Sequence, residues 1–427
     1  MGKVPIISVT GTKGKTTTVA IIDDVLRRLD QQVMKVDTTG HFVNGQRKST
    51  LDDSKAIWHL VPSVCPGRYL WEFHAHPELC ERGVAVLECA LGSSAISGLG
   101  YRYHDVGVFL NVFEDHIGSS ERIQSKADIV KAKEFIFSRL QKENSYAVFN
   151  ADDSFVISAL GAIPGENGGV THIPVGLMFD IYDLEAHLNK GGIAITMNEQ
   201  KQAVIRTAKG DAVVADLTVI PWTFDGNFTP SVWNILSAIG ALYGYYKGQL
   251  PQGFKEAVEQ VRLDRYGGRL TVLKTDNNIK IIADYAHEKI SLTSVARLAR
   301  TQLEGDGRVI GVVRLAHDRT DDLIIDTGKA IAPEYDELIV YDKIDGHLRK
   351  ATRKTGRFIE VEGRTSQVLY DAIKSTMPQT TRIIREDEAI RYAASIAKPG
   401  DVVVIIVNDD IERSIAFIQD SFKAEFI

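Results

Sequence analysis

The segment GTKGKTTT, at residues 11–18, brings together residue types that bind phosphate groups. Gly11 and Gly14 let backbone N–H groups turn inward toward phosphate oxygens. Lys15 can reach the outer phosphates, and Thr16 can offer its hydroxyl group to Mg²⁺. Apolar residues before the loop are typical of a strand, and apolar residues after it recur every three or four positions, as in a helix. The sequence therefore predicts a phosphate-binding P-loop; a glycine-rich turn that opens a helix by chance is the alternative.

The spacing within this loop differs from the usual one. A common P-loop has four residues between its first glycine and the GK pair, whereas here only Thr12 and Lys13 intervene. The shortened loop points away from GTPases and kinases.

Length and composition set further bounds. A chain of 427 residues is too long for one ordinary core and predicts two domains of unequal size. A formal charge of −6 argues against nucleic acid or an anionic membrane as a partner, and no apolar stretch approaches a membrane span. The N-terminus reads as a strand rather than a cleavable signal, so we expect a cytoplasmic protein. The cysteines show neither a CxxC pair nor a zinc spacing and are expected to be reduced thiols: Cys65, Cys80 and Cys89.

Strand and helix patterns alternate over residues 1–163, which predicts an α/β domain with a mostly parallel sheet. Short alternating runs at 191–219 predict a small antiparallel flap on that domain. Paired glycines make 264–269 the expected hinge. Strands and helices alternate again after it, so we expect a P-loop ATPase domain at 1–265 and a smaller Rossmann-like domain at 266–427.

Metal-binding residue types follow two predicted strands. Glu88 ends one apolar run, and Asp115 and His116 come just after another. Because the carboxyl ends of parallel strands meet at the edge where the loop would hold phosphates, these side chains fit a Mg-nucleotide site. Taken singly, Glu88 would more often be an ordinary exposed acid at a strand end than a ligand, and His116 a loop histidine. Lys133 lies at or beside the buried edge of an amphipathic helix, where a solvated lysine is the simpler interpretation.

Seven motifs occur in the order found in the Mur ligase superfamily: GTKGKTTT, LECALGSSAISGLG, NVFEDHIG, KAKEFIF, FNADD, GGRL and DYAH. The chain resembles an ATP-dependent amino-acid ligase of that superfamily over nearly all of its length. Within it, the chain is most similar to the C-terminal ligase half of cyanophycin synthetases. The resemblance implies that ATP phosphorylates a substrate carboxylate. An amino acid or other amine then attacks the acyl phosphate, and an amide forms as phosphate leaves.

The same resemblance implies a catalytic and metal site. It assigns Thr16 and Glu88 to a first Mg²⁺ ion and His116 to a second. Lys133 falls where several members carry a carbamylated lysine, whose CO₂ adduct is a carboxylate-like metal ligand. With Lys15, these side chains are the expected catalytic group: Lys15, Glu88, His116 and Lys133.

Three further residues match the family's nucleotide contacts. Asn234 matches the asparagine at adenine, Asp284 the acid at the ribose, and Arg269 the arginine that reaches the phosphates. By residue type alone, Asn234 is equally a cap or turn residue and Arg269 a member of a surface ion pair. The implied nucleotide-binding set is Gly11, Thr12, Lys13, Gly14, Lys15, Thr16, Thr17, Asn234, Arg269 and Asp284.

The second domain departs from the family pattern. Glu288 and Lys289 follow DYAH where asparagine and proline are usual, and Arg314 and His317 replace small residues in a loop that shapes the amino-acid end of the site in relatives. These departures suggest an altered incoming substrate. The expected substrate-binding residues are Thr38, Thr39, His287, Arg314 and His317.

The sequence leaves several functions open. The leading hypothesis is a stand-alone ligase that joins a carboxylate to an amino acid or other amine; neither substrate nor the oligomeric state is specified. Because the printed chain shows neither a UDP-binding domain nor an ATP-grasp half, we do not expect it to make cyanophycin alone. The alternatives are a folylpolyglutamate-synthase-like ligase and a non-catalytic nucleotide-binding regulator.

Overall fold

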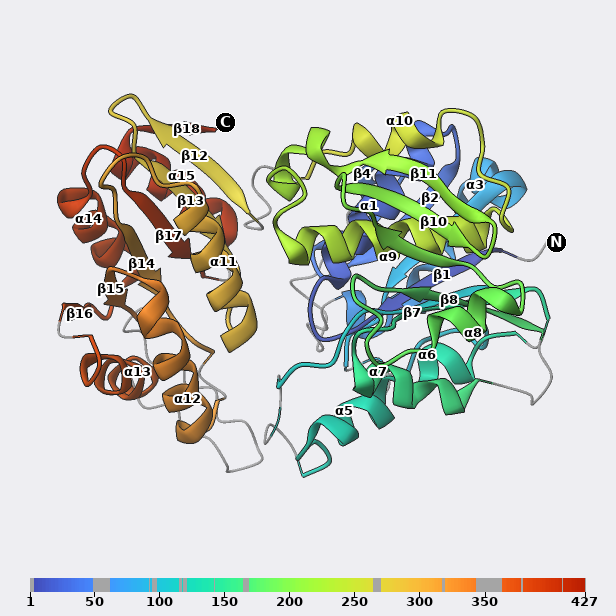
Figure 1. Cartoon of the computed structure of the whole chain (residues 1–427), viewed down its shortest axis with the longest axis horizontal. Coiled ribbons are helices and arrows are strands. Elements are labelled where there is room, and N and C mark those ends of the chain that lie inside the picture. Colours follow the sequence, from blue (N-terminus) through green and yellow to red (C-terminus); the bar gives the residue numbers. More distant parts are fainter. Residues whose placement is uncertain are drawn as a thin grey trace. The chain divides into compact units, whose positions relative to one another are not determined.

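The chain forms two compact units, each with its own β-sheet and helices packed against it (Figure 1). Unit 1 consists of Met1–Phe113 with Ser125–Leu263, and unit 2 of Glu114–Gln124 with Asp264–Ile427. The structure is a computed structural model. It describes residues 4–48, 62–91, 93, 98–114, 117, 121–141, 143–163, 169–263, 270–316, 319–342, 363–377, 379–408 and 410–426.

Unit 1 contains an eleven-stranded sheet with the order β11-β10-β9-β8-β7-β6-β1-β5-β2-β3-β4. Its middle strands pair in parallel, and β3, β4, β10 and β11 add antiparallel margins. The strands are β1 (Ile6–Thr10), β2 (Gln32–Asp37), β3 (Gly40–Val43), β4 (Gln46–Arg47), β5 (Gly83–Glu88), β6 (Val106–Phe109), β7 (Ser145–Asn150), β8 (Val170–Val175), β9 (Ala194–Met197), β10 (Gln202–Thr207) and β11 (Gly210–Asp216).

Helices cover both faces of this sheet, which explains why β1, β5 and β6 are buried along their whole lengths. On one face α1 packs against α9 over a shared apolar core. On the other face Phe137 of α6 packs against Phe109 of β6, with ring centroids 6.0 Å apart. The helices are α1 (Lys15–Arg28), α2 (Glu72–Ala75), α3 (Pro77–Arg82), α5 (Lys126–Lys133), α6 (Phe135–Ser138), α7 (Ser154–Ser158), α8 (Leu184–Asn189), α9 (Thr229–Tyr245) and α10 (Phe254–Glu259).

The predicted antiparallel flap is present, but it is part of the main sheet. Strands β9, β10 and β11 pair antiparallel in sequence order. Strand β9 also pairs in parallel with β8 through Val175 and Ile195. The flap therefore extends the parallel sheet rather than forming a separate layer.

Unit 2 contains a seven-stranded sheet with the order β16-β15-β14-β17-β13-β12-β18. Its first five strands in this order are parallel, as expected for a Rossmann-like domain, and β12 and β18 form an antiparallel margin. The elements are β12 (Thr271–Thr275), β13 (Lys280–Asp284), α11 (Lys289–Thr301), β14 (Val309–Val313), α12 (Asp321–Ile331), β15 (Glu337–Val340), α13 (Arg364–Lys374), β16 (Thr380–Arg382), α14 (Glu386–Ile396), β17 (Val402–Ile406), α15 (Ile411–Phe422) and β18 (Ala424–Phe426).

The chain changes direction across the sheet of unit 2 between β14 and β17. From β13 it passes through α11 to β14 and then outward to β15 and β16. It returns through α14 to β17, and α15 leads to β18 at the opposite margin. Helices α14 and α15 share one apolar core against the sheet. The adjacent ends of β14 and β17 are therefore the topological switch point of this unit, where ligands of such sheets usually bind.

A buried histidine in unit 1 is expected to make stability depend on pH. His104 is fully buried, its Nε2 lies 2.7 Å from the Ile136 carbonyl oxygen, and burial lowers its pKa from 6.5 to about 4. Between these pH values the unfolded chain binds a proton that the folded chain does not, so stability falls as the pH decreases from 6.5 toward 4. The loss is about 3 kcal/mol.

Tryptophan fluorescence during urea unfolding measures this effect, since all four tryptophans lie in the sequence of unit 1. In His104→Gln the free energy of unfolding should fall by about 3 kcal/mol less over the same pH range. If the free energy of unfolding fell equally with decreasing pH in the wild type and in His104→Gln, the prediction would be wrong.

Candidate nucleotide and metal site

The P-loop lies at the topological switch point of unit 1. Strands β1 and β6 are parallel neighbours, and the chain leaves them in opposite directions across the sheet, from β1 to β2 and from β6 to β7. The loop after β1 and the residues after β6 therefore meet at the carboxyl edge of the sheet. In open α/β sheets this is the usual place for a ligand.

Close contacts explain both glycines of the loop. Gly11 and Gly14 have φ values of +148° and +83°. A Cβ atom on Gly14 would lie 2.2 Å from Oδ1 of Asn234, and one on Gly11 would lie 2.8 Å from Cβ of Leu110. Asn234 thus lies against the loop from α9, and its Oδ1 also accepts a hydrogen bond from the Thr18 hydroxyl at 3.4 Å.

Asn111, which the sequence analysis did not single out, holds the loop. Its Oδ1 accepts the backbone N–H groups of Thr12 at 3.1 Å and Lys13 at 2.9 Å, and its Nδ2 donates to the Lys13 carbonyl at 3.2 Å. These two N–H groups are engaged by protein, which differs from the expected inward-facing loop. Among the residues that the structure describes, no side chain caps the start of α1, so the first turn of that helix is the part of the motif suited to phosphate.

The carboxylate of Glu88 accepts hydrogen bonds from hydroxyl groups of two other segments. It is 2% exposed, and its Oε2 accepts the Thr16 hydroxyl at 2.8 Å. From the end of β2, Thr38 donates its hydroxyl to Oε1 at 2.8 Å and its N–H to Oε2 at 3.1 Å. The Ser63 hydroxyl, which sequence reasoning missed, lies 3.3 Å from that of Thr38. Thr39 does not bond to Glu88 in these contacts; its N–H and hydroxyl both donate to Asp37.

Lys133 is buried beside this cluster at the end of α5. Lys133 is only 3% exposed, and its Nζ donates a hydrogen bond to the Thr10 hydroxyl at 3.3 Å. Thr10 in turn donates to the Cys89 carbonyl, directly after Glu88. Burial raises the pKa of the Cys89 thiol to about 12; the Glu88 carboxylate adds to this rise and the Lys133 ammonium opposes it. The thiol therefore stays protonated and unreactive.

The oxygen donors around Glu88 fit magnesium. Within the described ranges no group of three or more His, Cys, Asp or Glu side chains could hold a metal ion by itself. Magnesium at phosphate sites needs only one or two carboxylates, because water and substrate phosphates supply the other ligands. The Thr16 hydroxyl and the Glu88 carboxylate, 2.8 Å apart at the P-loop, are such a donor set.

The candidate residues of unit 2 cluster at the carboxyl edge of its sheet. Asp284 ends β13 and accepts the Leu270 N–H at 2.9 Å. His287 has its Nδ1 2.8 Å from the Tyr285 carbonyl oxygen. Arg314 follows β14, is 1% exposed, and donates to the Val407 carbonyl at 2.6 Å.

Some expectations lie outside the described residues. These are the roles of Asp115, His116, Arg269 and His317 and the hinge at 264–269. For Thr17, the structure shows a buried residue in the first turn of α1.

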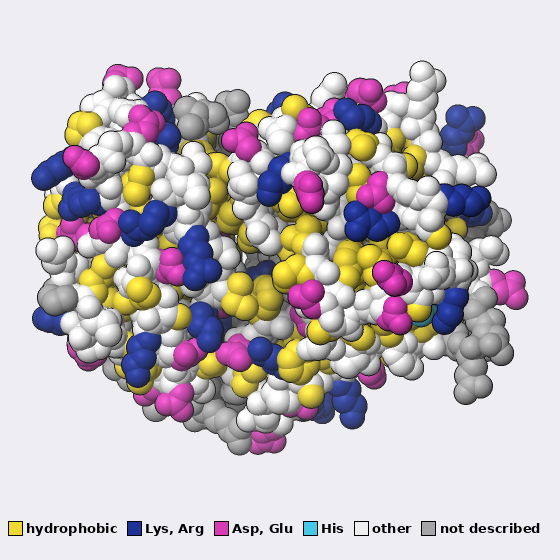
Figure 2. Space-filling model, viewed as in Figure 1, with side chains coloured by type: hydrophobic (Ala, Val, Ile, Leu, Met, Phe, Trp, Pro, Cys, Tyr) yellow, Lys and Arg dark blue, Asp and Glu magenta, His cyan; other side chains and the backbone are white. Residues whose placement is uncertain are grey.

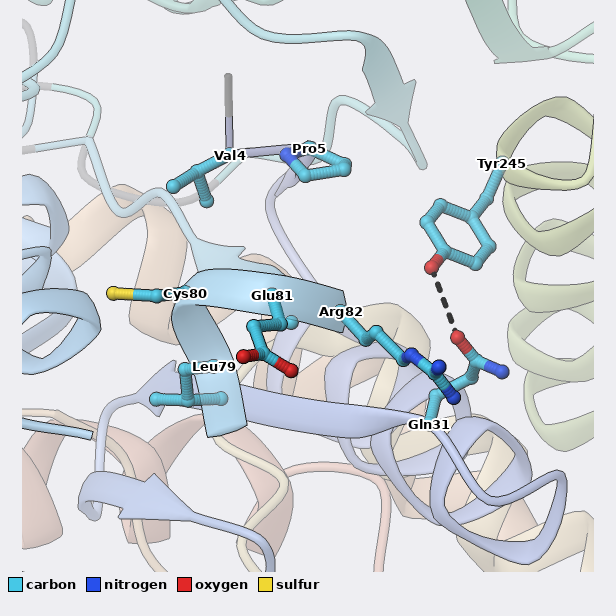
Figure 3. A pocket seen from close by; sticks show the side chains of 9 residues that line it. Val4, Pro5, Gln31, Leu79, Cys80, Glu81, Arg82 and Tyr245 are labelled. Atoms are coloured by element: carbon cyan, nitrogen blue, oxygen red, sulfur yellow. Dashed lines mark hydrogen bonds between the residues drawn. The ribbon is translucent and has the colours of Figure 1, made fainter. Parts of the chain in front are cut away.

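A pocket of about 320 Å³ lies at the opposite edge of the sheet of unit 1 (Figure 3). Residues before β1 and β2 and around the start of β5 line it, and in Figure 3 Tyr245 donates a hydrogen bond to Gln31 at 3.3 Å. Because β1, β2 and β5 are parallel, this amino edge is remote from the P-loop. The pocket does not belong to the nucleotide and metal site.

On the face shown in Figure 2, basic and acidic side chains are interspersed. Among the described helices, none combines the length and apolar character needed to cross a membrane.

A strand, glycine loop and helix at the switch point of a parallel sheet, followed by a second α/β unit, define a P-loop protein of two α/β units. The chain belongs to the Mur ligase family. Residues 9–167 match the Mur ligase middle domain, and residues 268–406 match the Mur ligase glutamate ligase domain.

Curated relatives agree with this assignment. The chain is 28% identical to a cyanophycin synthetase of Trichormus variabilis over 98% of this chain and 42% of the relative. It is 23% identical to a UDP-N-acetylmuramoyl-L-alanyl-D-glutamate--2,6-diaminopimelate ligase of Parabacteroides distasonis over 94% of this chain and 72% of that protein. The chain thus spans less than half the length of the cyanophycin synthetases that it matches.

Solved structures share the fold. E. coli FolC in complex with DHPP and ADP has a TM-score of 0.66 at 17% identity, covering 97% of this chain and 89% of that chain. MurF ligase from Thermotoga maritima in complex with ADP has a TM-score of 0.60 at 14% identity, covering 99% and 81%.

Proposed function

We propose that this protein is an ATP-dependent ligase that activates a substrate carboxylate as an acyl phosphate and couples it to an amino acid or other amine. The observation that carries the proposal is the convergence of Thr16 and Thr38 on the Glu88 carboxylate at the P-loop. Membership of the Mur ligase family supports it.

The reaction has two balanced steps. A carboxylate oxygen attacks the γ-phosphorus of ATP, the bond to the β–γ bridging oxygen breaks, and ADP leaves. The amine nitrogen then attacks the acyl carbon, the carbon–oxygen bond to phosphate breaks, and the nitrogen loses a proton. Lys15 and the first turn of α1 stabilise the negative charge that gathers on the phosphates in both steps.

Magnesium fits the oxygen donors of Thr16 and Glu88, and the family pattern adds His116 for a second ion. When bound, the ions neutralise phosphate charge. The protein's own part is to aim these donors: Thr38 fixes both oxygens of Glu88, and Ser63 lies against Thr38.

We also propose that Lys133 is carbamylated. Its unprotonated amine would attack the carbon of CO₂, forming one N–C bond and releasing one proton. The product is an anion where an ammonium group would repel a metal. Two observations support a carbamate that faces a metal ion at this place. Lys133 is buried, and it bonds to Thr10, whose hydroxyl donates to the carbonyl group directly after Glu88.

The remaining roles follow the family pattern. Residues 1–265 form the ATP-binding domain and 266–427 the C-terminal domain. Asn234 contacts adenine. The position of its side chain against Gly14 of the P-loop supports this role. Asp284 contacts the ribose and Arg269 the phosphates, while Thr38, Thr39, His287, Arg314 and His317 form the substrate end. We place the enzyme in the cytoplasm.

The second candidate function is a folylpolyglutamate-synthase-like ligase. The FolC fold, with its 89% coverage, favours it, whereas the cyanophycin synthetase relatives favour the first. Both share the chemistry proposed above and differ in the acid that is activated.

Two measurements on the wild-type protein test the proposal. Calorimetry should detect ATP binding in the presence of Mg²⁺. A coupled assay over pooled amino acids and simple acids, with a pteroate-type acid as a separate arm, should detect ADP release that requires both an acid and an amine. ATP binding without substrate-dependent ADP release would favour a nucleotide-binding regulator, and no ATP binding would overturn both ligase functions.

A further inference from the structure

The pocket at the amino edge of the sheet in unit 1 is lined by two charged groups of opposite sign. Its volume of about 320 Å³ is that of a small-molecule site. Glu81 and Arg82, the last two residues of α3, line it, and neither forms a hydrogen bond or an ion pair with another described residue. Figure 3 shows their charged groups on different sides of the pocket. The pocket therefore offers a carboxylate and a guanidinium that do not neutralise each other.

The other lining residues supply an ordered polar group and an apolar wall. Tyr245 donates to Oε1 of Gln31 at 3.3 Å, and Nε2 of Gln31 donates to the Leu29 carbonyl at 3.3 Å. Figure 3 shows the side chain of Arg82 directed toward Gln31. Three apolar residues also line the pocket: Val4, Pro5 and Leu79. A small ligand with one anionic group, one cationic group and an apolar part complements this lining.

The elements around this pocket reach the nucleotide and metal site at their other ends. Strand β1 begins beside the pocket and leads into the P-loop, and α1 leads from the P-loop back to Gln31. Strand β5 begins at the pocket and ends at Glu88. Helix α9 ends at Tyr245, and its Asn234 lies against the P-loop. A ligand in the pocket would therefore contact the far ends of all four elements.

We propose that this pocket is a regulatory site that binds a free α-amino acid through Arg82 and Glu81, and that its occupation changes the affinity of the protein for ATP. The guanidinium of Arg82 holds the carboxylate of the ligand, and the carboxylate of Glu81 holds its ammonium group. The regulatory role rests on the ATP binding of the proposed function, whereas binding of the amino acid does not. Linkage requires that ATP changes the affinity for the amino acid by the same factor.

Calorimetry without ATP tests recognition, with the standard amino acids added one at a time at millimolar concentrations. For an amino acid that binds, the carboxamide lacks the negative charge and the N-acetyl derivative lacks the positive charge. Each should bind about fivefold more weakly, the value of an exposed ion pair. Arg82→Met should abolish the preference over the carboxamide, and Glu81→Gln the preference over the N-acetyl derivative. Arg28→Met is the matched control, because Arg28 is exposed at the end of α1 and does not line the pocket.

A thiol in the pocket reports where the amino acid binds. Cys80 lines the pocket and is exposed, whereas Cys65 is half-buried. The bound amino acid should slow the alkylation of Cys80 by iodoacetamide, measured by mass spectrometry, and should leave the rate at Cys65 unchanged. In Arg82→Met this protection should require a higher concentration of the amino acid. Unchanged affinity in both Arg82→Met and Glu81→Gln, without protection of Cys80, would place the amino acid elsewhere and overturn the inference.

The regulatory role is tested by calorimetry of ATP with Mg²⁺, with and without the saturating amino acid. The dissociation constant of ATP should change by at least about fivefold. Arg82→Met should reduce this change at the same concentration and keep the wild-type affinity for ATP alone. An unchanged dissociation constant in a protein that binds both ligands would overturn the regulatory role and leave the ligase function standing. No binding of ATP, with Cys80 still protected by the amino acid, would instead overturn the ligase function and the regulatory role together.

Simple anions are the competing occupants of the pocket. Acetate and inorganic phosphate carry the negative charge without the ammonium group. If either bound as tightly as the best amino acid and protected Cys80 equally, the pocket would be an anion site only, and the inference would be wrong. The same holds if none of the standard amino acids binds.

Discussion

Lys15→Ala should lower substrate-dependent ADP release by about 10³-fold and weaken ATP binding measured by calorimetry. Lys15 is the first residue of α1, and its Nζ donates to the Thr12 carbonyl at 3.0 Å, so its charge is held over the loop. Removing it takes a cation from the place where phosphate charge gathers in both chemical steps. The loss should therefore appear mainly in kcat when ATP saturates the enzyme.

Arg28→Ala is the matched control, because Arg28 is a basic residue at the exposed end of the same helix. It pairs with Asp24 at 2.9 Å, and such surface pairs contribute about 1 kcal/mol or less to stability. This variant should keep the wild-type rate. If Lys15→Ala retained a rate within tenfold of the wild type, the P-loop would not be the site of phosphoryl transfer.

Most strands could be predicted because buried parallel strands are continuous apolar runs. Strand β5, at Gly83–Glu88, is such a run and is buried along its whole length. Strand β8 was missed because it contains Pro174, which signals an edge or a break. The structure accommodates this proline because β8 pairs with β9 at only one residue pair. Strand β18 has three residues, too few to show a period.

The sequence also could not place the stretch from 45 to 78. Its described part is anchored by a buried contact, in which Nε2 of His41 lies 2.8 Å from Glu72 of α2. His76 contacts the other oxygen of Glu72 at 3.2 Å. The partners His41 and Glu72 lie far apart in the chain and in different kinds of element, so no local pattern reveals the contact.

The candidate site was predicted only where a local motif or a family pattern marked it. Glu88 and Thr16 are examples, since each belongs to a motif. Asn111 and Ser63 were missed because their partners are distant in sequence: Asn111 binds the P-loop about 100 residues earlier, and Ser63 meets Thr38. Asn111 does stand in the motif NVFEDHIG, two residues after the end of β6, and that position was the available signal.

In both units a side chain that follows one strand bonds to the backbone that follows another strand at the switch point. In unit 1 the side chain of Asn111, which follows β6, bonds to the loop that follows β1. In unit 2 the side chain of Arg314, which follows β14, bonds to the carbonyl that follows β17. Each of these contacts joins the ends of two strands from which the chain leads in opposite directions across the sheet. The neutral amide of Asn111 orients a loop, whereas the guanidinium of Arg314 joins the ends of two neighbouring strands.

Lys133→Ala should lower the ligation rate roughly 300-fold, because it removes the anion proposed to face the metal. The residue is buried, so the substitution leaves a space that a short carboxylic acid can enter. Acetate or propionate should therefore restore part of the lost rate, at least about tenfold at saturation. Lys131→Ala is the matched control, since Lys131 is exposed on the same helix two residues away.

The pattern of rescue separates the possible roles of this lysine. A carbamate predicts rescue by acids but not by amines, and a wild-type rate that falls when CO₂ is removed from the buffer. An ammonium group that acts through its positive charge predicts the reverse, with rescue by short alkylamines and no dependence on CO₂. Full activity of Lys133→Ala would refute both, and it would leave the contact with Thr10 as a packing feature only.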